Sequence, residues 1–465
     1  MIKKTFLLLF FLLSFGKNAT AGSNYFVDGV SSGDPTQKTV ILWSRVQDDK
    51  IDALEVEYEV SKDITFDKIL KNGKINTNNN KDHTLKIDID NLRQDTTYYY
   101  RFKYNNQYSE TGKTKTLPED PKKLRIAFVS CQNFGGGYFT SYKYIIEDNP
   151  DLIIMLGDSI YEHAKYQYRK DESGYGKDLE SYRKKYKYYF TDNFYKEAKE
   201  KIPFMYIWDD HEIENDYSGV DFSKIKEKQM KDGYQAFFEY NPVRKIGENK
   251  IYRNYNIGNL LDLYFLDGRQ YRKEPACDGL QILNYPCTIK SYKEDNTYLG
   301  KEQKQWLKDN LKNSKAKWKI ISNNTMMMET NFFGALLNFD EWDGYMKEKQ
   351  EMLEYIYDNN IKNTLVFTGD LHMFIQGKLM FKNKKVIEEF VATSISSPIP
   401  SFVNYLTPIA PLVVKDITLL ETAYRGYILA DFNSRKTNVY FYSVPVLSNK
   451  DFERKLLKKF EIKPF

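Results

Sequence analysis

The stretch Asp151-Leu-Ile-Ile-Met-Leu-Gly-Asp-Ser-Ile-Tyr161 runs from a short apolar segment directly into a glycine and an aspartate. A second apolar run, Leu124–Val129, lies upstream, and residues Tyr138–Asn149 between the two have the pattern of a helix. A strand–helix–strand unit of this kind is typical of a parallel or mixed sheet. The sequence therefore predicts an α/β domain built around this unit.

The same alternation of apolar runs and helical patterns continues to the end of the chain. Further strands are expected at Ile202–Trp208, Leu261–Leu266, Lys317–Ser322, Thr364–Phe367 and Lys385–Thr393. Helices are expected at Asp221–Tyr240, Lys301–Leu311 and Glu348–Asn359, with a short terminal helix within Asp451–Lys463.

The N-terminal part has a different pattern. From Tyr25 to about Leu117 apolar and polar residues alternate, and turn signals such as Asn72-Gly73 recur between the runs. This pattern predicts about seven short strands in an antiparallel sandwich. The Pro-containing stretch 116–121 is the expected linker. We therefore expect a β-sandwich domain over residues 24–118 and an α/β domain over residues 122–465.

The first 21 residues have the features of a secretory leader. Lys3 and Lys4 precede the apolar run Phe6–Leu13, and Ala19-Thr-Ala21 supplies the small residues for cleavage after Ala21. The run is far shorter than the ~20 residues that span a bilayer. We predict export to the periplasm, the cell exterior or a secretory compartment, with no transmembrane segment after cleavage.

Charge and cysteine content limit the partners of the exported chain. The 69 Lys and Arg face 64 Asp and Glu, and three of the lysines lie in the leader. A nearly neutral chain gives no electrostatic reason to expect nucleic acid as a dedicated partner. Cys277 and Cys287 are close enough in sequence to form a disulfide, whereas Cys131 is left over. The oligomeric state stays open, and a monomer is compatible with the sequence.

Acidic residues follow three of the predicted strands. They occur in Gly157-Asp158, in Asp209-Asp210-His211-Glu212 and in Gly369-Asp370-Leu-His372. Carboxylates that converge at one sheet edge repel one another unless a cation neutralises them, so these residues predict a metal centre. Oxygen ligands favour hard cations such as Ca²⁺, Mg²⁺ or Mn²⁺.

A second metal position is expected around Asp158. Cys131, Tyr161 and His372 could gather there, and a thiolate and a phenolate together suit a ferric ion. The other histidines have simpler interpretations. His83 is expected at the surface of the sandwich, and His163 is expected to be structural.

The ordered series Gly157-Asp-x-x-Tyr161, Asp209-Asp-His-Glu212, Asn323-Asn-Thr-Met326 and Gly369-Asp-x-His372 resembles the PhoD-type alkaline phosphatases of the calcineurin-like metallophosphoesterase superfamily. Supporting motifs are Ser130-Cys-Gln132, Leu266–Arg272, Leu299–Trp306 and, near the N-terminus, Gly29–Pro35 with Leu42–Arg45. The resemblance implies a metallophosphoesterase-type α/β sandwich of two mixed sheets flanked by helices. It also implies an N-terminal all-β domain of the fibronectin type III or immunoglobulin-like kind.

The same resemblance implies roles for individual residues. Asp158 would bridge two metals, and Cys131, Tyr161 and His372 would complete an Fe³⁺ site. Asp210 and Asp370 would hold one or two Ca²⁺ with Asn324 near them, although Asn324 stands where the family usually has glutamine. His211 would stabilise or protonate the reacting phosphate, and Asn215 and Arg269 would contact it. Mn²⁺, Mg²⁺, Zn²⁺ and Co²⁺ are compatible alternatives.

The expected reaction is hydrolysis of a phosphate monoester. Two metals would neutralise the phosphate oxygens and lower the pKa of a bridging water, so that hydroxide or oxide attacks phosphorus. Two alternatives remain: a phosphodiesterase acting on a phospholipid or nucleotide through the same site, and an exported binding protein with no catalytic activity.

Overall fold

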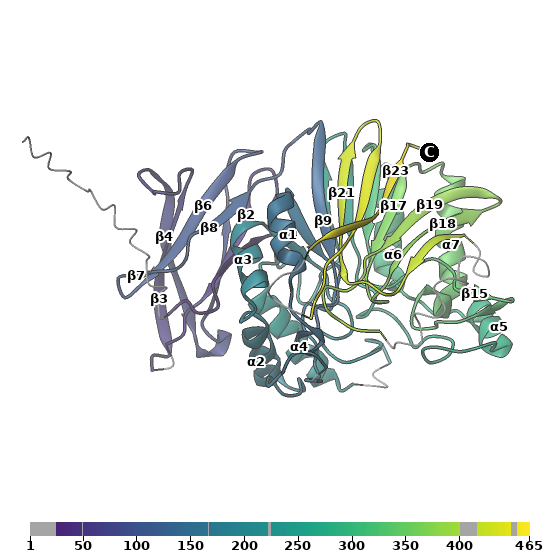
Figure 1. Ribbon diagram of the computed structural model, residues 1–465, viewed down its shortest axis with the longest axis horizontal. Coiled ribbons are helices and arrows are strands. Elements are labelled where there is room, and N and C mark those ends of the chain that lie inside the picture. The colour runs from purple at the N-terminus through teal and green to yellow at the C-terminus, as the bar shows by residue number, and fades with distance from the viewer. Residues whose placement is uncertain (1–24, 49, 166, 222–224, 400–415, 448–452) are drawn as a thin grey trace, which may run out of the picture.

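The computed structural model describes residues 25–48, 50–165, 167–221, 225–399, 416–447 and 453–465. The predicted leader, residues 1–21, lies outside them. Two mixed sheets pack face to face at the centre of the molecule, with helices on the outer sides (Figure 1). None of the helices in the described ranges combines the length and the apolar content that crossing a bilayer would require.

The first sheet has nine strands in the order β23-β22-β21-β9-β10-β11-β1-β2-β5. Its strands β9, β10, β11 and β1 run parallel, and the outer pairs are antiparallel. The bounds are β23 Lys455–Ile462, β22 Thr437–Ser443, β21 Gly426–Asn433, β9 Lys123–Val129, β10 Leu152–Met155, β11 Phe204–Tyr206, β1 Val30–Gly33, β2 Val40–Arg45 and β5 Thr84–Ile89.

The second sheet has seven strands in the order β12-β13-β14-β17-β19-β18-β20. The bounds are β12 Arg253–Ile257, β13 Leu261–Phe265, β14 Trp318–Ser322, β17 Thr364–Thr368, β19 Lys384–Val391, β18 Phe374–Phe381 and β20 Ile417–Glu421. A short hairpin, β15 Asn331–Phe332 with β16 Ala335–Leu336, stands apart from both sheets.

The apolar runs noted in the sequence are strands that are buried on both faces. In β9, Ile126 and Phe128 face the second sheet, whereas Ala127 and Val129 face the helices. Phe128 stacks on Phe367 of the second sheet at a ring-centroid distance of 3.9 Å. Because helices cover the outer faces as well, no polar alternation is needed along these strands.

The helices fall into two groups on opposite sides of the sheet pair. The first sheet is covered by α1 Ser141–Asp148, α2 Leu179–Tyr189, α3 Asn193–Lys201 and α4 Glu227–Tyr240. The second is covered by α6 Gly300–Asn313 and α7 Met346–Asp358, and α5 Tyr285–Lys293 lies beside them. The mixed α/β sandwich expected from the sequence is confirmed. The helices expected at Lys301–Leu311 and Glu348–Asn359 begin and end within two residues of α6 and α7, whereas α4 begins six residues after the expected start at Asp221.

The N-terminal all-β region is confirmed, with eight strands instead of about seven within residues 25–48 and 50–118. Strands β3 Ala53–Ser61, β4 Ile69–Asn78, β6 Thr97–Tyr104, β7 Gln107–Tyr108 and β8 Gly112–Lys115 form a separate sheet. Strands β1, β2 and β5 instead join the nine-stranded sheet, because Gly33 of β1 pairs with Phe204 of β11. A Cβ at Gly33 would lie 2.6 Å from the carbonyl oxygen of Phe204, so glycine permits this junction.

Two expectations from the sequence are wrong. The described part of Asp451–Lys463 contains strand β23 and not a helix, because its backbone pairs with the edge of β22 while Phe460 packs against the core between the sheets. His83 is 2% exposed, and its Nε2 lies 3.0 Å from the carbonyl oxygen of Asp52. It is therefore a buried turn residue and not a surface residue.

Candidate metal centre

The predicted site residues lie at one end of the two sheets, where the central parallel strands finish. Cys131 follows β9 and Asp158 follows β10. Asp209 and Asp210 follow β11, and Asp370 follows β17. Ligands usually bind at the carboxyl ends of parallel strands, because loops from neighbouring strands meet there. Segments far apart in the sequence thus bring their acidic side chains together.

One group of candidate ligands surrounds Asp158. Ligand atoms of Cys131, Asp158 and His372 lie within 4.8 Å of one another. The Tyr161 hydroxyl is 3.0 Å from Oδ2 of Asp158 and 3.0 Å from Nε2 of His372. Nδ1 of His372 lies 2.9 Å from the carbonyl oxygen of Pro398, which directs Nε2 towards the group. The sulfur, carboxylate, phenol and imidazole therefore share one position.

A second group is formed by carboxylates. Ligand atoms of Asp209, Asp210 and Asp370 lie within 4.8 Å of one another, and the same holds for Asp158, Asp210 and His211. Asp158 thus belongs to the group that contains Cys131 and also to a group that contains Asp210. A carboxylate shared by two adjacent groups of candidate ligands is compatible with a dinuclear metal centre.

Unusual backbone conformations hold these side chains in place. Cys131, Asp158, Asp370 and His372 all have positive φ, between 56° and 66°. Such conformations are unfavourable for residues other than glycine, and they cluster at functional sites. Gly157, which precedes Asp158, lies so close to the next loop that a Cβ there would be 2.5 Å from the Cβ of Asp209. The glycine of the Gly-Asp motif therefore allows the loops to meet.

The electrostatics of the site favour a bound cation. Burial, together with neighbouring carboxylates, raises the pKa of Asp158 and of Asp370. Burial also raises the pKa of the Cys131 thiol and lowers that of His372 to about 3. One carboxylate oxygen of Asp209 is buried without a hydrogen-bond partner among the described residues. Several acids in one buried place are costly unless positive charge neutralises them, so the donor set fits metal ions.

His211 is held by a residue that sequence reasoning missed. Its Nδ1 lies 2.6 Å from Oε2 of Glu162, and its ring stacks on Tyr161 at a centroid distance of 4.0 Å. Burial lowers the pKa of His211, but the charges of Asp210, Glu162 and Asp158 outweigh burial and raise it. His163 packs edge-on to His211 at 5.4 Å. The sequence offered one signal for Glu162: it directly follows Tyr161, a predicted metal ligand.

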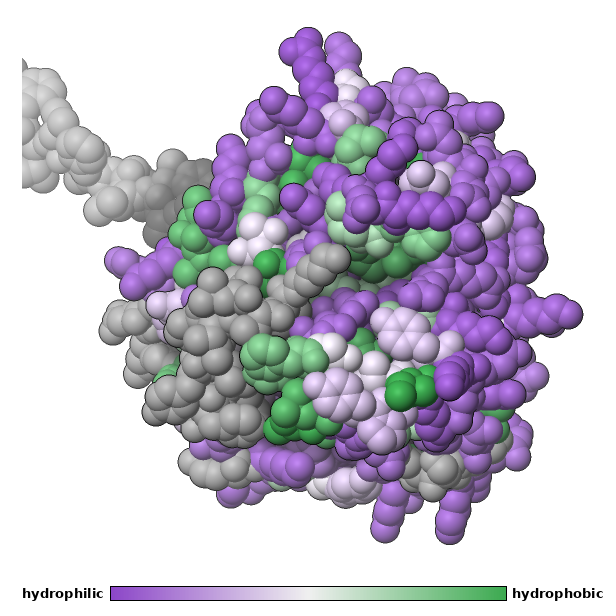
Figure 2. Space-filling model, turned by 90° about the vertical axis from the view of Figure 1, so that its right-hand side faces the viewer, coloured by the Kyte–Doolittle hydropathy of each residue, from purple (hydrophilic) through white to green (hydrophobic). Residues whose placement is uncertain are grey.

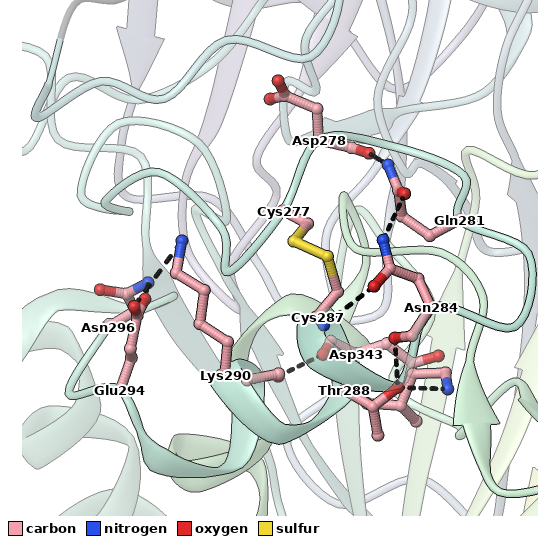
Figure 3. The surroundings of a disulfide bond; sticks show 12 residues. Cys277, Asp278, Gln281, Asn284, Cys287, Thr288, Lys290, Glu294, Asn296 and Asp343 are labelled. Atoms are coloured by element: carbon pink, nitrogen blue, oxygen red, sulfur yellow. Dashed lines mark hydrogen bonds and ion pairs between the residues drawn. A yellow bond between two sulfur atoms is a disulfide. The ribbon is translucent and has the colours of Figure 1, made fainter.

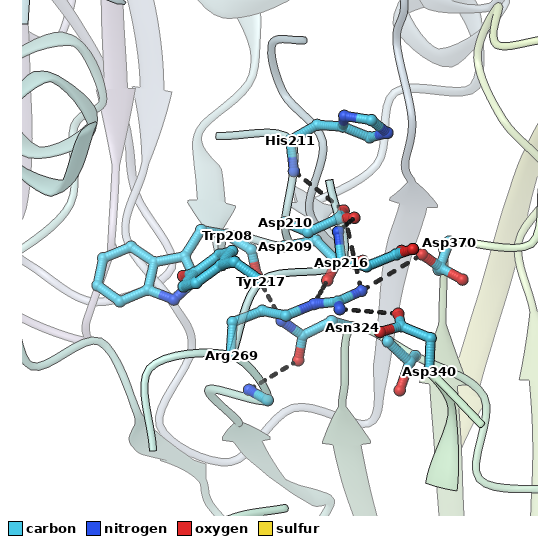
Figure 4. A network of polar contacts seen from close by, with 12 residues as sticks. Trp208, Asp209, Asp210, His211, Asp216, Tyr217, Arg269, Asn324, Asp340 and Asp370 are labelled. Carbon is cyan, nitrogen blue, oxygen red and sulfur yellow. Dashed lines mark hydrogen bonds and ion pairs between the residues drawn. The ribbon is translucent and has the colours of Figure 1, made fainter. Parts of the chain in front are cut away.

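Arg269 lies inside the acidic group (Figure 4). Its guanidinium is completely buried, donates to Asp209 and lies 2.8 Å from Asp340. Its Nη2 is 3.5 Å from Asp370 and 3.8 Å from Asp210 and has no hydrogen-bond partner in the described chain. Arg269 was predicted to contact phosphate. Its Nη2 is therefore a buried donor without a hydrogen bond among the described residues, next to the candidate ligands Asp210 and Asp370.

The two predicted asparagines lie in different settings. Asn324 bridges two loops, since its Nδ2 donates to the carbonyl of Trp208 at 2.6 Å and its Oδ1 accepts from the amide of Gly268 at 3.0 Å. Asn215 is exposed on the turn before Asp216, whose amide donates to Asp210 at 2.7 Å. The site also contains residues that the sequence did not predict: Asp340 and Arg272, which pair at 2.6 Å, and Glu341 beside Asp370.

Comparisons with known proteins agree with this geometry. Residues 126–441 match the family model "PhoD-like phosphatase", and residues 14–118 match "PhoD-like phosphatase, N-terminal domain". The chain is 34% identical to alkaline phosphatase D of Bacillus subtilis over 412 residues, which is 80% of this chain and 69% of the relative. A solved structure of PhoD superposes with a TM-score of 0.87 at 29% identity, covering 95% of this chain and 91% of that one. A purple acid phosphatase from yellow lupin shares the fold at 12% identity, with a TM-score of 0.58 and coverage of 93% and 74%.

Proposed function

Because the chain belongs to the PhoD-like phosphatase family and is therefore a phosphoric ester hydrolase, we propose that it is an exported, metal-dependent enzyme acting on phosphate monoesters. One observation carries the proposal: ligand atoms of Asp158, Asp210 and His211 lie within 4.8 Å of one another, although Asp158 follows β10 and the other two residues follow β11. Such a cluster neutralises a dianionic phosphate only when cations occupy it.

We assign Fe³⁺ to the group of Cys131, Asp158, Tyr161 and His372, because thiolate and phenolate ligands stabilise a ferric ion. One or two Ca²⁺ would lie with Asp158, Asp210 and Asp370, whose oxygens suit a hard cation. Ions bound there would act as Lewis acids on the phosphate oxygens and lower the pKa of a water molecule. Asn324 would act as the support behind this group through its contacts to Trp208 and Gly268.

The remaining roles belong to side chains of the protein. His211 would give a proton to the leaving oxygen from Nε2, since Glu162 occupies its Nδ1. Arg269 would offer Nη2 to a phosphate oxygen, and Asn215 would approach the phosphate from its exposed turn. Asp209 would hold Arg269 in position through their buried ion pair.

Export is supported by the disulfide between Cys277 and Cys287, whose Cα atoms are 5.8 Å apart (Figure 3). Disulfides persist in oxidising compartments. Mass spectrometry of the protein secreted by its host should find the mature N-terminus at Gly22. Retention of residues 1–21 in the mature protein would contradict this part of the proposal.

Metal analysis together with activity tests the proposed function. The purified enzyme should contain stoichiometric iron and a divalent ion, hydrolyse p-nitrophenyl phosphate, lose activity on chelation and regain it on reloading. Faster hydrolysis of bis-p-nitrophenyl phosphate would assign the site to phosphodiesters instead. Full activity after complete removal of metal would contradict the metal-dependent proposal.

A further inference from the structure

Helix α5 presents its large apolar side chains to solvent. Tyr285, Ile289 and Tyr292 are 48%, 52% and 36% exposed, whereas the small residues Cys287, Thr288 and Ser291 are buried. The spacing i, i+4, i+7 places the three large side chains in one stripe along the helix. A helix that packs only against its own domain normally shows the reverse arrangement.

Neighbouring segments extend this stripe into a surface, which we call the α5 face. Leu280, Ile282 and Leu283 precede the helix and are 64%, 76% and 45% exposed, and Phe333 at the tip of the β15–β16 hairpin is 70% exposed. The hydroxyl of Tyr285 donates to the carbonyl of Phe333 at 3.0 Å, which joins helix and hairpin. Figure 2 shows apolar and weakly polar side chains gathered on the lower part of the molecular side that carries α5.

The α5 face is held rigidly. The disulfide Cys277–Cys287 closes the loop, and Asn284 caps the helix by accepting from the amide of Cys287 (Figure 3). The amide of Gln281 donates to Leu337 at 2.7 Å, and the Ser291 hydroxyl donates to the carbonyl of Asp343. A partner that binds a fixed surface orders few side chains, so little entropy opposes its binding.

The area and charge of the face fit a second copy of the chain. Their exposed fractions give the seven residues together roughly 700–800 Å² of accessible surface, backbone and tyrosine hydroxyls included, against ~300–600 Å² for the largest apolar patch on a typical monomer. This is about the ~800 Å² that each partner contributes to a standard stable interface. Asp278, Lys290 and Glu294 lie beside α5 (Figure 3), and Lys290 pairs with Glu294 at 3.6 Å, so both signs of charge are present next to the face. An anionic lipid surface would favour a basic rim instead.

We propose that the α5 face is the contact of a two-fold symmetric homodimer. Two copies of α5 run antiparallel across the axis, with Ile289 near the centre of the stripe in each. The inference is independent of the reaction at the metal centre, because the stripe lies on the outer side of α5.

The oligomeric state of the full mature chain tests the proposal. Light scattering after size exclusion and sedimentation velocity, from about 0.5 to 50 µM, should give twice the chain mass. The double variant Ile282→Glu/Ile289→Glu should be monomeric over this range with its melting temperature retained, because four buried charges weaken association more than ~100-fold. The matched control is Ile64→Glu, which alters a 63% exposed isoleucine in the N-terminal domain and should stay dimeric.

A cross-link provides a second readout. Ile289→Cys should form an intermolecular disulfide on a non-reducing gel, whereas Ile64→Cys should not. A wild-type protein that is monomeric at 50 µM, or a double variant that is still dimeric, would overturn the proposal. Co-sedimentation of monomeric wild type with phosphatidylcholine/phosphatidylglycerol vesicles, lost in the double variant, would assign the face to lipid and also overturn it.

Discussion

Replacement of Asp158 by asparagine should change stability in opposite directions with and without metal. The side chain is almost completely buried and belongs to both groups of candidate ligands. Asparagine keeps the shape of the side chain but removes its charge. Without metal the variant loses a repulsive interaction, and with metal it loses a shared ligand.

The magnitude follows from the spacing of the carboxylates. Ligand oxygens of Asp158 and Asp210 lie within 4.8 Å. At an effective dielectric constant of about 20, two such charges repel by ~3–4 kcal/mol, and His211 and Arg269 offset part of this. We therefore expect metal-free Asp158→Asn to be ~1–2 kcal/mol more stable than wild type at pH 9, which raises its melting temperature by ~1–4 °C. Turnover in the presence of metal should fall more than ~1,000-fold, since the metals contribute several kcal/mol to transition-state stabilisation.

Thermal unfolding in chelator and in metal-containing buffer measures both effects, with p-nitrophenyl phosphate turnover and elemental analysis in parallel. The control is Asp431→Asn. Asp431 forms an ion pair of 2.6 Å with Arg125, and this pair is not part of the site. This control should lose up to about 1 kcal/mol in both buffers and keep its activity. Melting of Asp158→Asn below wild type in chelator would refute the expected repulsion, and full metal content and turnover in metal-containing buffer would refute the shared-ligand role.

Three further predictions concern single features. Glu162→Gln should lower turnover ~10–100-fold and leave the metal content unchanged. The loss should be larger for alkyl phosphates than for p-nitrophenyl phosphate, because a poor leaving group needs the proton from His211. Equal losses on both substrates would argue against proton donation. Replacing Cys277 and Cys287 by serine should lower the stability of the loop that the disulfide closes by about 2–3 kcal/mol. Hydrogen exchange in α5 should then be faster, and unchanged exchange would contradict this. Burial raises the pKa of Glu200 from 4.5 to about 7, so wild type loses stability as the pH rises through this window. Glu200→Gln should therefore gain ~1–2 kcal/mol over wild type at pH 8 after allowance for solvent screening, and nothing at pH 4, in paired thermal melts.

The sequence predicted the position of the candidate site because strand ends leave a local signal. A short apolar run followed by Gly-Asp indicates a buried strand that ends in a carboxylate, as at Asp158 and Asp370. Long-range pairing leaves no such signal. Neither the parallel contact of Gly33 with Phe204 nor the packing of β23 on β22 could be deduced from local patterns, so the terminal strand was predicted as a helix.

The surroundings of the site were likewise beyond local patterns. Glu162 and Asp340 do not lie directly after strands. Glu162 contacts His211, which is 49 residues away in the sequence, and Asp340 contacts Arg272, which is 68 residues away. Arg269 was predicted as a phosphate contact, but its ion pairs to aspartates of several loops depend on tertiary packing. His83 was predicted at the surface because a single turn histidine has no sequence feature that reports burial.

Anomalous diffraction from crystals of the purified wild-type enzyme tests the metal centre most directly. We expect an iron peak within ligand distance of Cys131, Tyr161 and His372, and at least one other metal peak near Asp210 and Asp370, with Asp158 between them. Crystals of active enzyme that show no peak at these side chains, or metals only elsewhere, would contradict the account.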